Sequence, residues 1–354
     1  MSNIMGTIGA SALLATALAF SIVPSAHAEI SFAGKQVTVI IGSKAGGGTD
    51  GQGRLLGAFL GEHLPGKPQV IYSNIPGSSG IKAINHFATR VKADGTSVLS
   101  ASSVSLEPTT LKRTEVVKYD PREFAMIGGV TAGGTVMVIK ADAKARLMDK
   151  GGQPVVVGAV DATRTGLSMA VWGAEYLGWN VKWVIGYSGT SALMMAIQQG
   201  EIDMTGTSSM RQIQRLLDNN KLTGFVQAGD YEDGKFVGRT TFPDIPVFPD
   251  MVLPKVDGVA REAFESWLYS NQVGKWFALP PKTQPEVAEI YRSAYRNIMA
   301  DPRFQERAKR EFGEDFEPMW AEGLTHVVKQ LASTSDEAMK FTTAMRVKHG
   351  LPAE

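Results

Sequence analysis

The chain contains no cysteine among its 354 residues. This absence excludes disulfide bonds, thiolate nucleophiles, cysteine-based zinc sites and a lipid anchor on an N-terminal cysteine. It suits an exported protein whose core is large enough to need no covalent cross-link. The chain also lacks a charge bias, because 36 Lys and Arg residues nearly balance 35 Asp and Glu residues. Without a basic stripe, we expect no nucleic-acid partner.

Histidine is scarce, and the sequence carries no familiar catalytic or metal motif. The chain has 5 histidines, and none stands in an H-E-x-x-H spacing. The segment Gly186–Thr190 resembles the G-x-S-x-G turn of hydrolases but ends in Thr190 instead of glycine. A dispersed Ser-His-Asp triad stays open, but nothing in the sequence points to one. We therefore expect a protein that is not an enzyme and that holds no metal and no cofactor.

Long hydrophobic runs are missing except near the start of the chain. Residues 8–23 are apolar but too short to span a bilayer comfortably. Ala26 and Ala28 then follow as the small residues that a signal peptidase reads. We expect residues 1–28 to be a signal peptide that is cleaved after Ala28, which places the mature protein in the periplasm, although residues 1–28 contain no Lys or Arg. A membrane anchor or a buried first helix is the alternative.

The most informative segment that is present runs from residue 37 to residue 54, V-T-V-I-I-G-S-K-A-G-G-G-T-D-G-Q-G-R. It predicts a short β-branched strand, a glycine turn and a helix that opens at Thr49 and Asp50. Glycine lets the backbone approach a ligand closely, and the free N–H groups of a helix start favour an anion. Asp50 can pair with Arg54 one turn later. The segment therefore favours capture of a small anion.

The same glycines allow another interpretation. Gly46–Gly51 satisfies the dinucleotide fingerprint G-x-G-x-x-G after a strand and before a helix. That fingerprint requires an acid about 20 residues later, and residues 71–74 (Ile-Tyr-Ser-Asn) contain none. No Lys-Ser or Lys-Thr pair follows the glycines, so the segment is not a P-loop either. A nucleotide-dependent α/β enzyme and a purely structural tight turn stay open as alternatives.

Strands and helices alternate along the chain, which predicts a parallel-rich α/β fold. We expect strands at residues 37–41, 69–72, 96–101, 124–130, 136–140, 154–160 and 182–185. A first domain crossing is expected at Ala132–Gly134, and residues 225–254 are expected to form a return linker with surface loops. Thr283–Glu286 has capping-box spacing before an amphipathic helix. A second polar loop, Thr163, Arg164 and Thr165, stands between a strand and a helix, where Arg164 can bind a carboxylate through both guanidinium arms.

Together, these segments resemble the periplasmic substrate-binding proteins of tripartite tricarboxylate transporters, the TctC or Bug family. The likeness covers nearly the whole mature chain and depends on the order and spacing of Gly46–Asp50 with Arg54, Asn74–Gly80, Asp94–Thr96, Tyr119–Pro121, Tyr187–Gly189, Gly200–Asp203, Phe242–Pro246 and Phe277–Pro280. Four residues depart from the family pattern. Ser43 and Lys44 stand where an aromatic residue is usual, Ile75 replaces an arginine, and Arg164 is an addition.

The resemblance implies a type II periplasmic-binding-protein fold, with two mixed-sheet α/β domains joined by a hinge with two chain crossings. It implies a first domain at residues 29–131, a second at 132–240 and a return to the first at 241–354. The ligand would be a small organic carboxylate, a dicarboxylate or an aromatic acid, held between the domains and delivered by a monomer to the membrane permease subunits. Presentation to a membrane kinase is an alternative role. The expected ligand-binding residues are Ser43, Lys44, Gly47, Gly48, Thr49, Asp50, Ser78, Ser79, Ser103, Thr163, Arg164, Thr165, Tyr187, Ser188 and Asp203.

Overall fold

The structure is a computed structural model of the whole chain, and it describes residues 30–218, 221–232, 234–312 and 316–353. The predicted signal peptide lies outside the described residues. Contacts group Ser31–Glu354 into one compact unit. Within the described ranges, no helix combines the length and the apolar character that crossing a bilayer requires.

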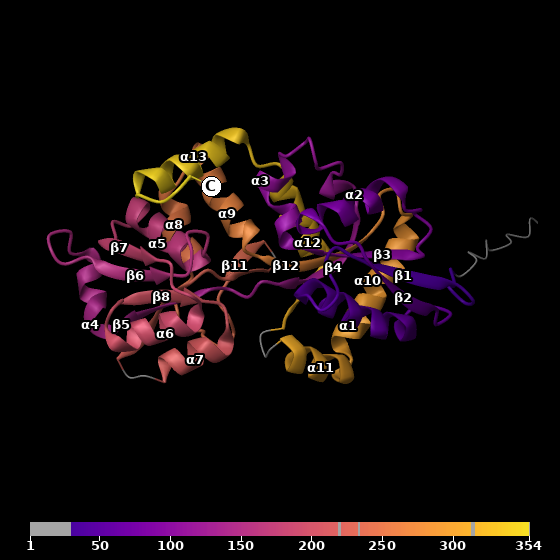
Figure 1. Cartoon of the computed structure of the whole chain (residues 1–354), viewed down its shortest axis with the longest axis horizontal. Helices are drawn as coiled ribbons and strands as arrows, with labels where there is room; N and C mark the ends of the chain where they lie inside the picture. Colours follow the sequence, from indigo (N-terminus) through magenta and orange to yellow (C-terminus); the bar gives the residue numbers. More distant parts are fainter. Residues whose placement is uncertain (1–29, 219–220, 233, 313–315, 354) are drawn as a thin grey trace, which may run out of the picture. The chain divides into compact units, whose positions relative to one another are not determined.

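The first sheet has six strands in the order β13-β4-β12-β3-β1-β2. Figure 1 labels all of these strands except β13. Its strands are β1 (Gln36–Ile41), β2 (Gln69–Asn74), β3 (Ser97–Ser102), β4 (Ala125–Thr131), β12 (Val273–Leu279) and β13 (Pro318–Trp320). Strand β1 pairs in parallel with β2 and β3, while β12 and β13 pair antiparallel with their neighbours. The predicted strands at 37–41, 69–72 and 96–101 are confirmed. The β-branched run of β1 is buried, as is typical of a parallel strand with neighbours on both sides, whereas β2 at the edge of the sheet is only partly buried.

Helices cover both faces of this sheet. The helices are α1 (Gly48–His63), α2 (Ile81–Arg90), α3 (Pro108–Leu111), α10 (Pro285–Ala300), α11 (Pro302–Phe312) and α12 (Ala321–Ala332). Phe87 of α2 and Leu324 of α12 share a core cluster with Trp276 of β12. On the other face α1 packs against α10. Tyr295 of α10 packs on Phe277 of β12, with ring centroids 6.2 Å apart. The predicted amphipathic helix is α10, but its cap is Gln284 with Pro285 following, so the expected capping box is wrong.

The second sheet has five strands in the order β7-β6-β8-β5-β9. Its strands are β5 (Val136–Lys140), β6 (Val155–Ala159), β7 (Val181–Ile185), β8 (Met204–Thr207) and β9 (Leu222–Gln227). The helices around it are α4 (Ala141–Lys144), α5 (Thr165–Tyr176), α6 (Thr190–Gln199), α7 (Met210–Leu217), α8 (Phe248–Val252), α9 (Gly258–Ser270) and α13 (Asp336–Lys348). Strand β6 pairs in parallel with β7 and β8, while β5 pairs antiparallel with β8 and β9.

The segment expected to be a linker with loops has more structure than its composition suggests. Residues 225–254 contain the end of β9, a hairpin of β10 (Asp230–Glu232) and β11 (Lys235–Val237), and helix α8. Phe248 and Val252 are fully buried in the core that also holds Trp172. The expectation of surface loops is therefore wrong for this part. The glycines and prolines end short elements here, and residues 238–247 between the hairpin and α8 form no helix or strand and are largely exposed or partly exposed.

The sheets also place the return of the chain later than residue 241. Phe248 and Phe264 still pack in the core of the second sheet, and the chain rejoins the first sheet only at β12. After α12, Ala338 and Met345 of α13 return to the second core, which makes a third passage. Because Ser31–Glu354 form one compact unit, the division into two domains stays a proposal. We draw the second crossing at Asn271 and Gln272.

Candidate functional site

The loops that follow β1, β2 and β3 meet at one edge of the first sheet. These three strands are parallel neighbours, so their carboxyl ends share that edge. The N–H of Gly42 donates to Ser100 at 3.0 Å, and the N–H of Ile75 donates to Ile41 at 2.9 Å. A Cβ on Gly42 would lie 3.3 Å from the Cα of Gly80, so the first two loops touch. In open α/β sheets this edge is the usual place for a ligand.

The glycine loop leaves room in front of helix α1. Gly46 has a φ of +81°, and Cβ atoms added at Gly46 or Gly48 would meet nothing within 4 Å. The helix starts with Gly47 as its cap and no side chain on its first N–H groups. Thr49 is buried, and its side chain does not cap the helix. The open helix start therefore offers backbone donors to an anion.

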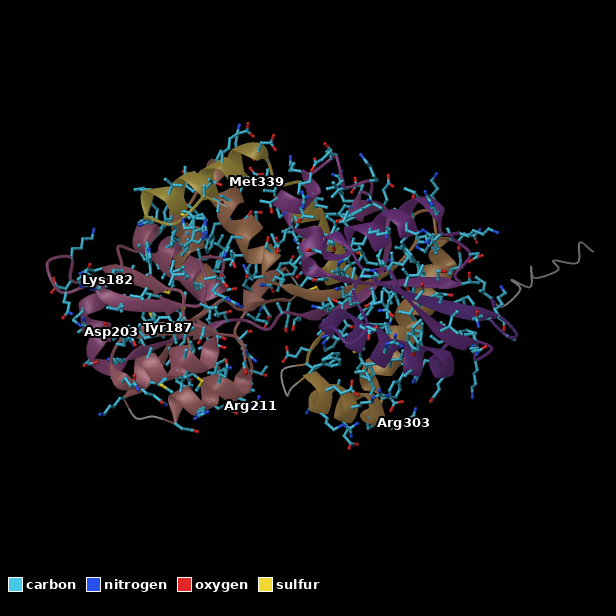
Figure 2. The ribbon with its side chains drawn as sticks, viewed as in Figure 1. Lys182, Tyr187, Asp203, Arg211, Arg303 and Met339 are labelled. Atoms are coloured by element: carbon cyan, nitrogen blue, oxygen red, sulfur yellow. The ribbon has the colours of Figure 1, made fainter. Side chains whose placement is uncertain are left out.

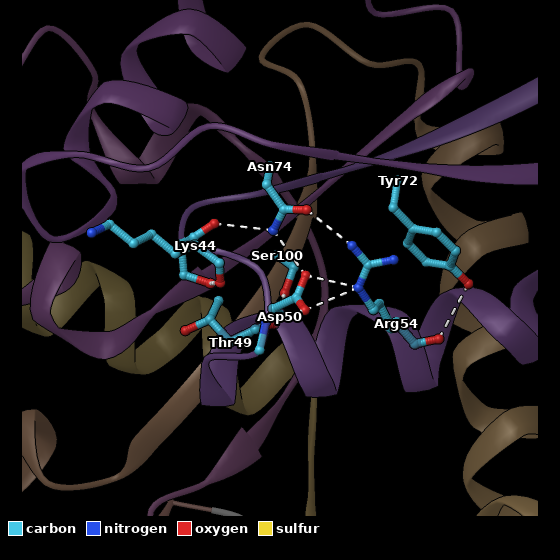
Figure 3. Close-up of polar contacts among 9 residues, drawn as sticks. Lys44, Thr49, Asp50, Arg54, Tyr72, Asn74 and Ser100 are labelled. Carbon is cyan, nitrogen blue, oxygen red and sulfur yellow. Dashed lines mark hydrogen bonds and ion pairs between the residues drawn. The ribbon is translucent and has the colours of Figure 1, made fainter.

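The carboxylate of Asp50 is held by hydrogen bonds to neighbouring residues (Figure 3). Its carboxylate accepts hydrogen bonds from Gly46 N at 2.9 Å, from Arg54 Nε at 2.9 and 3.0 Å, and from Asn74 Nδ2 at 2.8 Å. Only 3% of Asp50 is exposed. Burial favours the neutral acid, but the bonds from Arg54, Asn74 and Gly46 outweigh it and hold the pKa of Asp50 below its usual value. Asp50 therefore fixes the loop instead of facing a ligand.

Asn74 and Arg54 complete this network; the expected pairing of Asp50 with Arg54 is confirmed, whereas the bonds of Asn74 were not predicted. Asn74 Nδ2 also donates to the carbonyl of Ser43 at 3.0 Å, and Asn74 Oδ1 accepts from Arg54 at 3.0 Å. The guanidinium of Arg54 lies 4.9 Å from the ring centroid of Tyr72. Asn74 stands where a dinucleotide site requires an acid, so the amide and its protein partners disfavour the nucleotide interpretation. The Asn-x-Pro-Gly signature was the sequence signal that could have located it.

The second loop of this edge is conformationally strained. Ser78 and Ser79 have φ values of 47° and 53°, between Gly77 at 134° and Gly80 at 97°. A non-glycine residue in this region costs roughly 1–3 kcal/mol and is typical of ligand-binding segments. Both serines are exposed. Ser103 begins the loop after β3, so the structure brings Ser78, Ser79 and Ser103 to the same edge as the glycine loop.

An equivalent edge exists on the second sheet, where β6, β7 and β8 are parallel. Gly186, after β7, donates to the carbonyl of Ala159, at the end of β6, at 3.2 Å. The exposed residues Thr163, Arg164 and Ser188 follow these strand ends. The structure therefore gathers these three predicted residues at one edge of the second sheet.

Asp161 orders the Arg164 loop. Its carboxylate accepts from Thr163 N at 3.0 Å, from Thr163 Oγ1 at 2.7 Å and from Arg164 Nε at 3.0 Å. The hydrogen bond from the Thr163 hydroxyl contributes most to lowering the pKa of Asp161, and Arg164 lowers it further, so the pKa lies below its usual range. The side chain of Arg164 is 60% exposed, and its two terminal nitrogens make no hydrogen bond to the described residues. They can accept a carboxylate in a fork geometry.

Three predicted residues are engaged elsewhere. Thr165 Oγ1 donates to Asn271 at 2.6 Å, which ties α5 to the second crossing. The hydroxyl of Tyr187 donates to Glu201 at 2.7 Å, and burial together with that carboxylate raises the pKa of Tyr187 to about 12. Asp203 stands before β8, beside the amino end of β6, where Val156 N donates to it at 3.1 Å. Figure 2 labels Tyr187 and Asp203 on this part of the chain.

Asp203 stands at the amino end of β8, whereas Arg164 and Ser188 follow the carboxyl ends of β6 and β7. Asp203 therefore lies at the opposite edge of the second sheet from these two residues. Its carboxylate pairs with Arg146 at 3.0 Å and with Lys140 at 3.6 Å, and its side chain is only 10% exposed. These pairs join β5, β8 and the turn after α4. We leave Asp203 out of the proposed site for this reason. Among the described residues, no group of three His, Asp or Glu side chains could hold a metal ion.

With this geometry established, solved structures supply the comparison. A TctC solute-binding protein from Polaromonas, determined without ligand, matches with a TM-score of 0.64 at 17% identity, over 88% of this chain and 98% of that one. The chain has the fold of that protein. The periplasmic binding protein BugD matches with a TM-score of 0.46 at 21% identity, over 90% of this chain and 99% of that one. A protein of R. palustris with adipate gives 0.48 at 17%, over 90% and 98%.

The likeness to the Polaromonas protein confirms the predicted type II binding-protein fold, and at 17% identity it establishes nothing finer. No family model matches the sequence. No curated protein matches it either.

Proposed function

We propose that this chain is a periplasmic receptor that binds a small organic carboxylate and delivers it to a membrane permease of the tripartite tricarboxylate type. The observation that supports it most is that each of the two sheets has an edge rich in hydrogen-bond donors. The first sheet presents the uncapped start of α1 and the exposed Ser78 and Ser79, and the second presents Arg164 and Ser188. Both edges lie at carboxyl ends of parallel strands.

Each edge offers donors and few free acceptors, which suits an anion. At the first edge Asp50 is neutralised by Arg54, so its charge does not oppose the ligand. The proposed contacts there are the N–H groups around Gly47 and Gly48, with Lys44 adding a positive charge for a second carboxylate. Hydrogen bonds of a carboxylate to such donors are stronger than neutral ones. A dicarboxylate fits this arrangement best.

At the second edge, the proposed contacts are Thr163, Arg164 and Ser188. Closure of the two domains over the ligand would bring the edges together, because a ligand that binds the closed form better shifts the population toward it. The closed form would then dock on the permease as a monomer. The absence of an aromatic residue at Ser43 leaves space for a larger acid.

Binding can be measured by calorimetry and by thermal shift on residues 29–354, with mono-, di-, tri- and aromatic carboxylates as ligands. Amino acids and dinucleotides serve as controls. A ligand at 100 times its Kd stabilises the folded protein by about 2.7 kcal/mol. Shifts confined to carboxylates support the proposal. Shifts with dinucleotides alone would replace it with the nucleotide interpretation.

Arg164 has a matched control in this chain. Arg122 is also exposed and also donates from Nε to a neighbouring aspartate, Asp120, but it lies outside both edges. Arg164→Ala should weaken carboxylate binding by about 1.5–3 kcal/mol, the usual value of a charged hydrogen bond. Arg122→Ala should leave the affinity unchanged. Equal affinities for both variants would remove Arg164 from the site.

A further inference from the structure

A cavity of about 270 Å³ lies among α3, α5, α9 and α13. Its wall shares Thr163 with the residues proposed to bind the carboxylate, and its other lining residues lie outside that set. Trp172, Trp267 and Met339 supply apolar surface to it. The volume is just below the roughly 300–1,000 Å³ of typical ligand pockets. A small molecule would fill it.

Three partly buried hydroxyl groups of this wall have no hydrogen-bond partner among the described residues. Ser168 of α5, Ser270 of α9 and Thr343 of α13 line the cavity, and none of them bonds to the part of the chain that the structure describes. All three are partly buried. Other hydroxyls of the wall are engaged, as Thr342 Oγ1 is with the carbonyl of Ala338 at 3.2 Å. The unpartnered groups come from three helices, so they can bond a ligand from different sides.

The charges of the wall favour an uncharged ligand. The wall contains one acid, Glu107, and one base, Arg346, so its net charge is zero. The guanidinium of Arg346 is buried and donates to the carbonyl of Ala162 at 3.1 Å. An ion entering this space would lose hydration without a dedicated counter-ion. A neutral molecule would lose much less.

We propose that this cavity is a second ligand site, which binds a small uncharged aromatic or alicyclic molecule bearing hydroxyl groups. The ring would lie against Trp267 and Met339, and its hydroxyls would bond Ser168, Ser270 and Thr343. Phe264 stacks on Trp267 with ring centroids 5.5 Å apart and holds that wall in place. The proposal does not depend on the carboxylate site.

The test uses 4-hydroxybenzyl alcohol, phenol and cyclohexylmethanol as probes on the mature protein, with calorimetry and thermal shift as readouts. For ligands of about ten non-hydrogen atoms, we expect at least one Kd in about the millimolar range or tighter. Two variants fill the cavity from α13: Thr343→Trp, and Met339→Trp at the position that Figure 2 labels. Glu337→Trp is the control, because Glu337 is exposed on the same helix and outside the wall.

Each filling variant should weaken probe binding at least tenfold, whereas Glu337→Trp and Arg164→Ala should bind the probe as the wild type does. Circular dichroism identifies a variant that fails to fold. In that case, probe binding to the other filling variant tests the proposal. The proposal is overturned if no probe binds at about 10 mM, well above the expected Kd range. It is also overturned if a folded filling variant binds as tightly as the wild type.

Discussion

Asp230, at the start of β10, carries a buried acid whose titration should be visible in the stability of the protein. The residue is 6% exposed, and among the described residues its Oδ1 atom has no hydrogen-bond partner. Burial, aided by the nearby carboxylates of Glu317 and Glu232, raises the pKa of Asp230 to about 6. Arg239 and the N–H of Gly134 oppose this rise without cancelling it.

The size of the effect follows from the two pKa values. An unfolded aspartate titrates near 3.9, and each unit of difference corresponds to about 1.36 kcal/mol. Well below pH 4 the group is protonated in both states and contributes nothing. As the pH rises toward 6, the unfolded state ionises first, so the folded state loses stability. Above about pH 7 the loss is complete and amounts to roughly 3 kcal/mol.

Asp230→Asn removes this titration and nearly preserves the shape of the side chain. Unfolding by urea at several pH values should give equal stabilities for variant and wild type near pH 4, and a more stable variant at pH 8. Glu232→Gln is the control, because Glu232 is exposed on the same strand. If the difference between Asp230→Asn and the wild type is the same at pH 4 and pH 8, the carboxyl does not titrate near 6 and the reasoning is refuted.

Three further substitutions test the site. Asp50→Asn weakens the bonds that order the glycine loop and should cost about 2 kcal/mol of stability, because the partly exposed Arg54 can return to water; a Tm equal to the wild type's would contradict this. Ser79→Gly relieves a positive φ and should raise stability by up to about 1 kcal/mol, measured by urea unfolding; a loss would show that the serine is held by contacts. Asp203→Asn should lower the Tm but leave carboxylate affinity unchanged, and weaker binding would return Asp203 to the site.

Short-range sequence patterns were enough to predict individual strands and the parallel pairing around β1. The β-branched run before the glycine turn is β1, and the alternation around it predicted parallel neighbours, which the pairing of β1 with β2 and β3 confirms. The family resemblance implied Ser78 and Ser79 as binding residues, and the structure brings these exposed serines to the same strand edge as the glycine loop. The prediction of surface loops for residues 225–254 depended on amino-acid composition alone and was less accurate. Phe248 and Val252 are core residues within a stretch rich in glycine and proline.

The side chains misplaced by sequence reasoning depend on contacts between distant segments. Asp203 lies next to a strand in the sequence, but its role depends on which end of the strand it occupies. Strand β8 begins at Met204, so Asp203 stands at the amino end and meets Lys140 and Arg146. Tyr187 follows a strand end as predicted, yet its hydroxyl reaches Glu201, 14 residues later. No periodicity in the sequence reports such pairings.

The network at Asp50 explains how an acid can belong to a loop that is proposed to bind an anion. A free aspartate there would repel a carboxylate, but this one accepts four hydrogen bonds and pairs with Arg54. The pair has no net charge, so the field at the loop comes from the start of α1 and from the exposed Lys44. Those donors are fixed before the ligand arrives, because Asn74 links Asp50 to the carbonyl of Ser43. Binding then needs little reordering of the loop, and more of the interaction energy is available for closure.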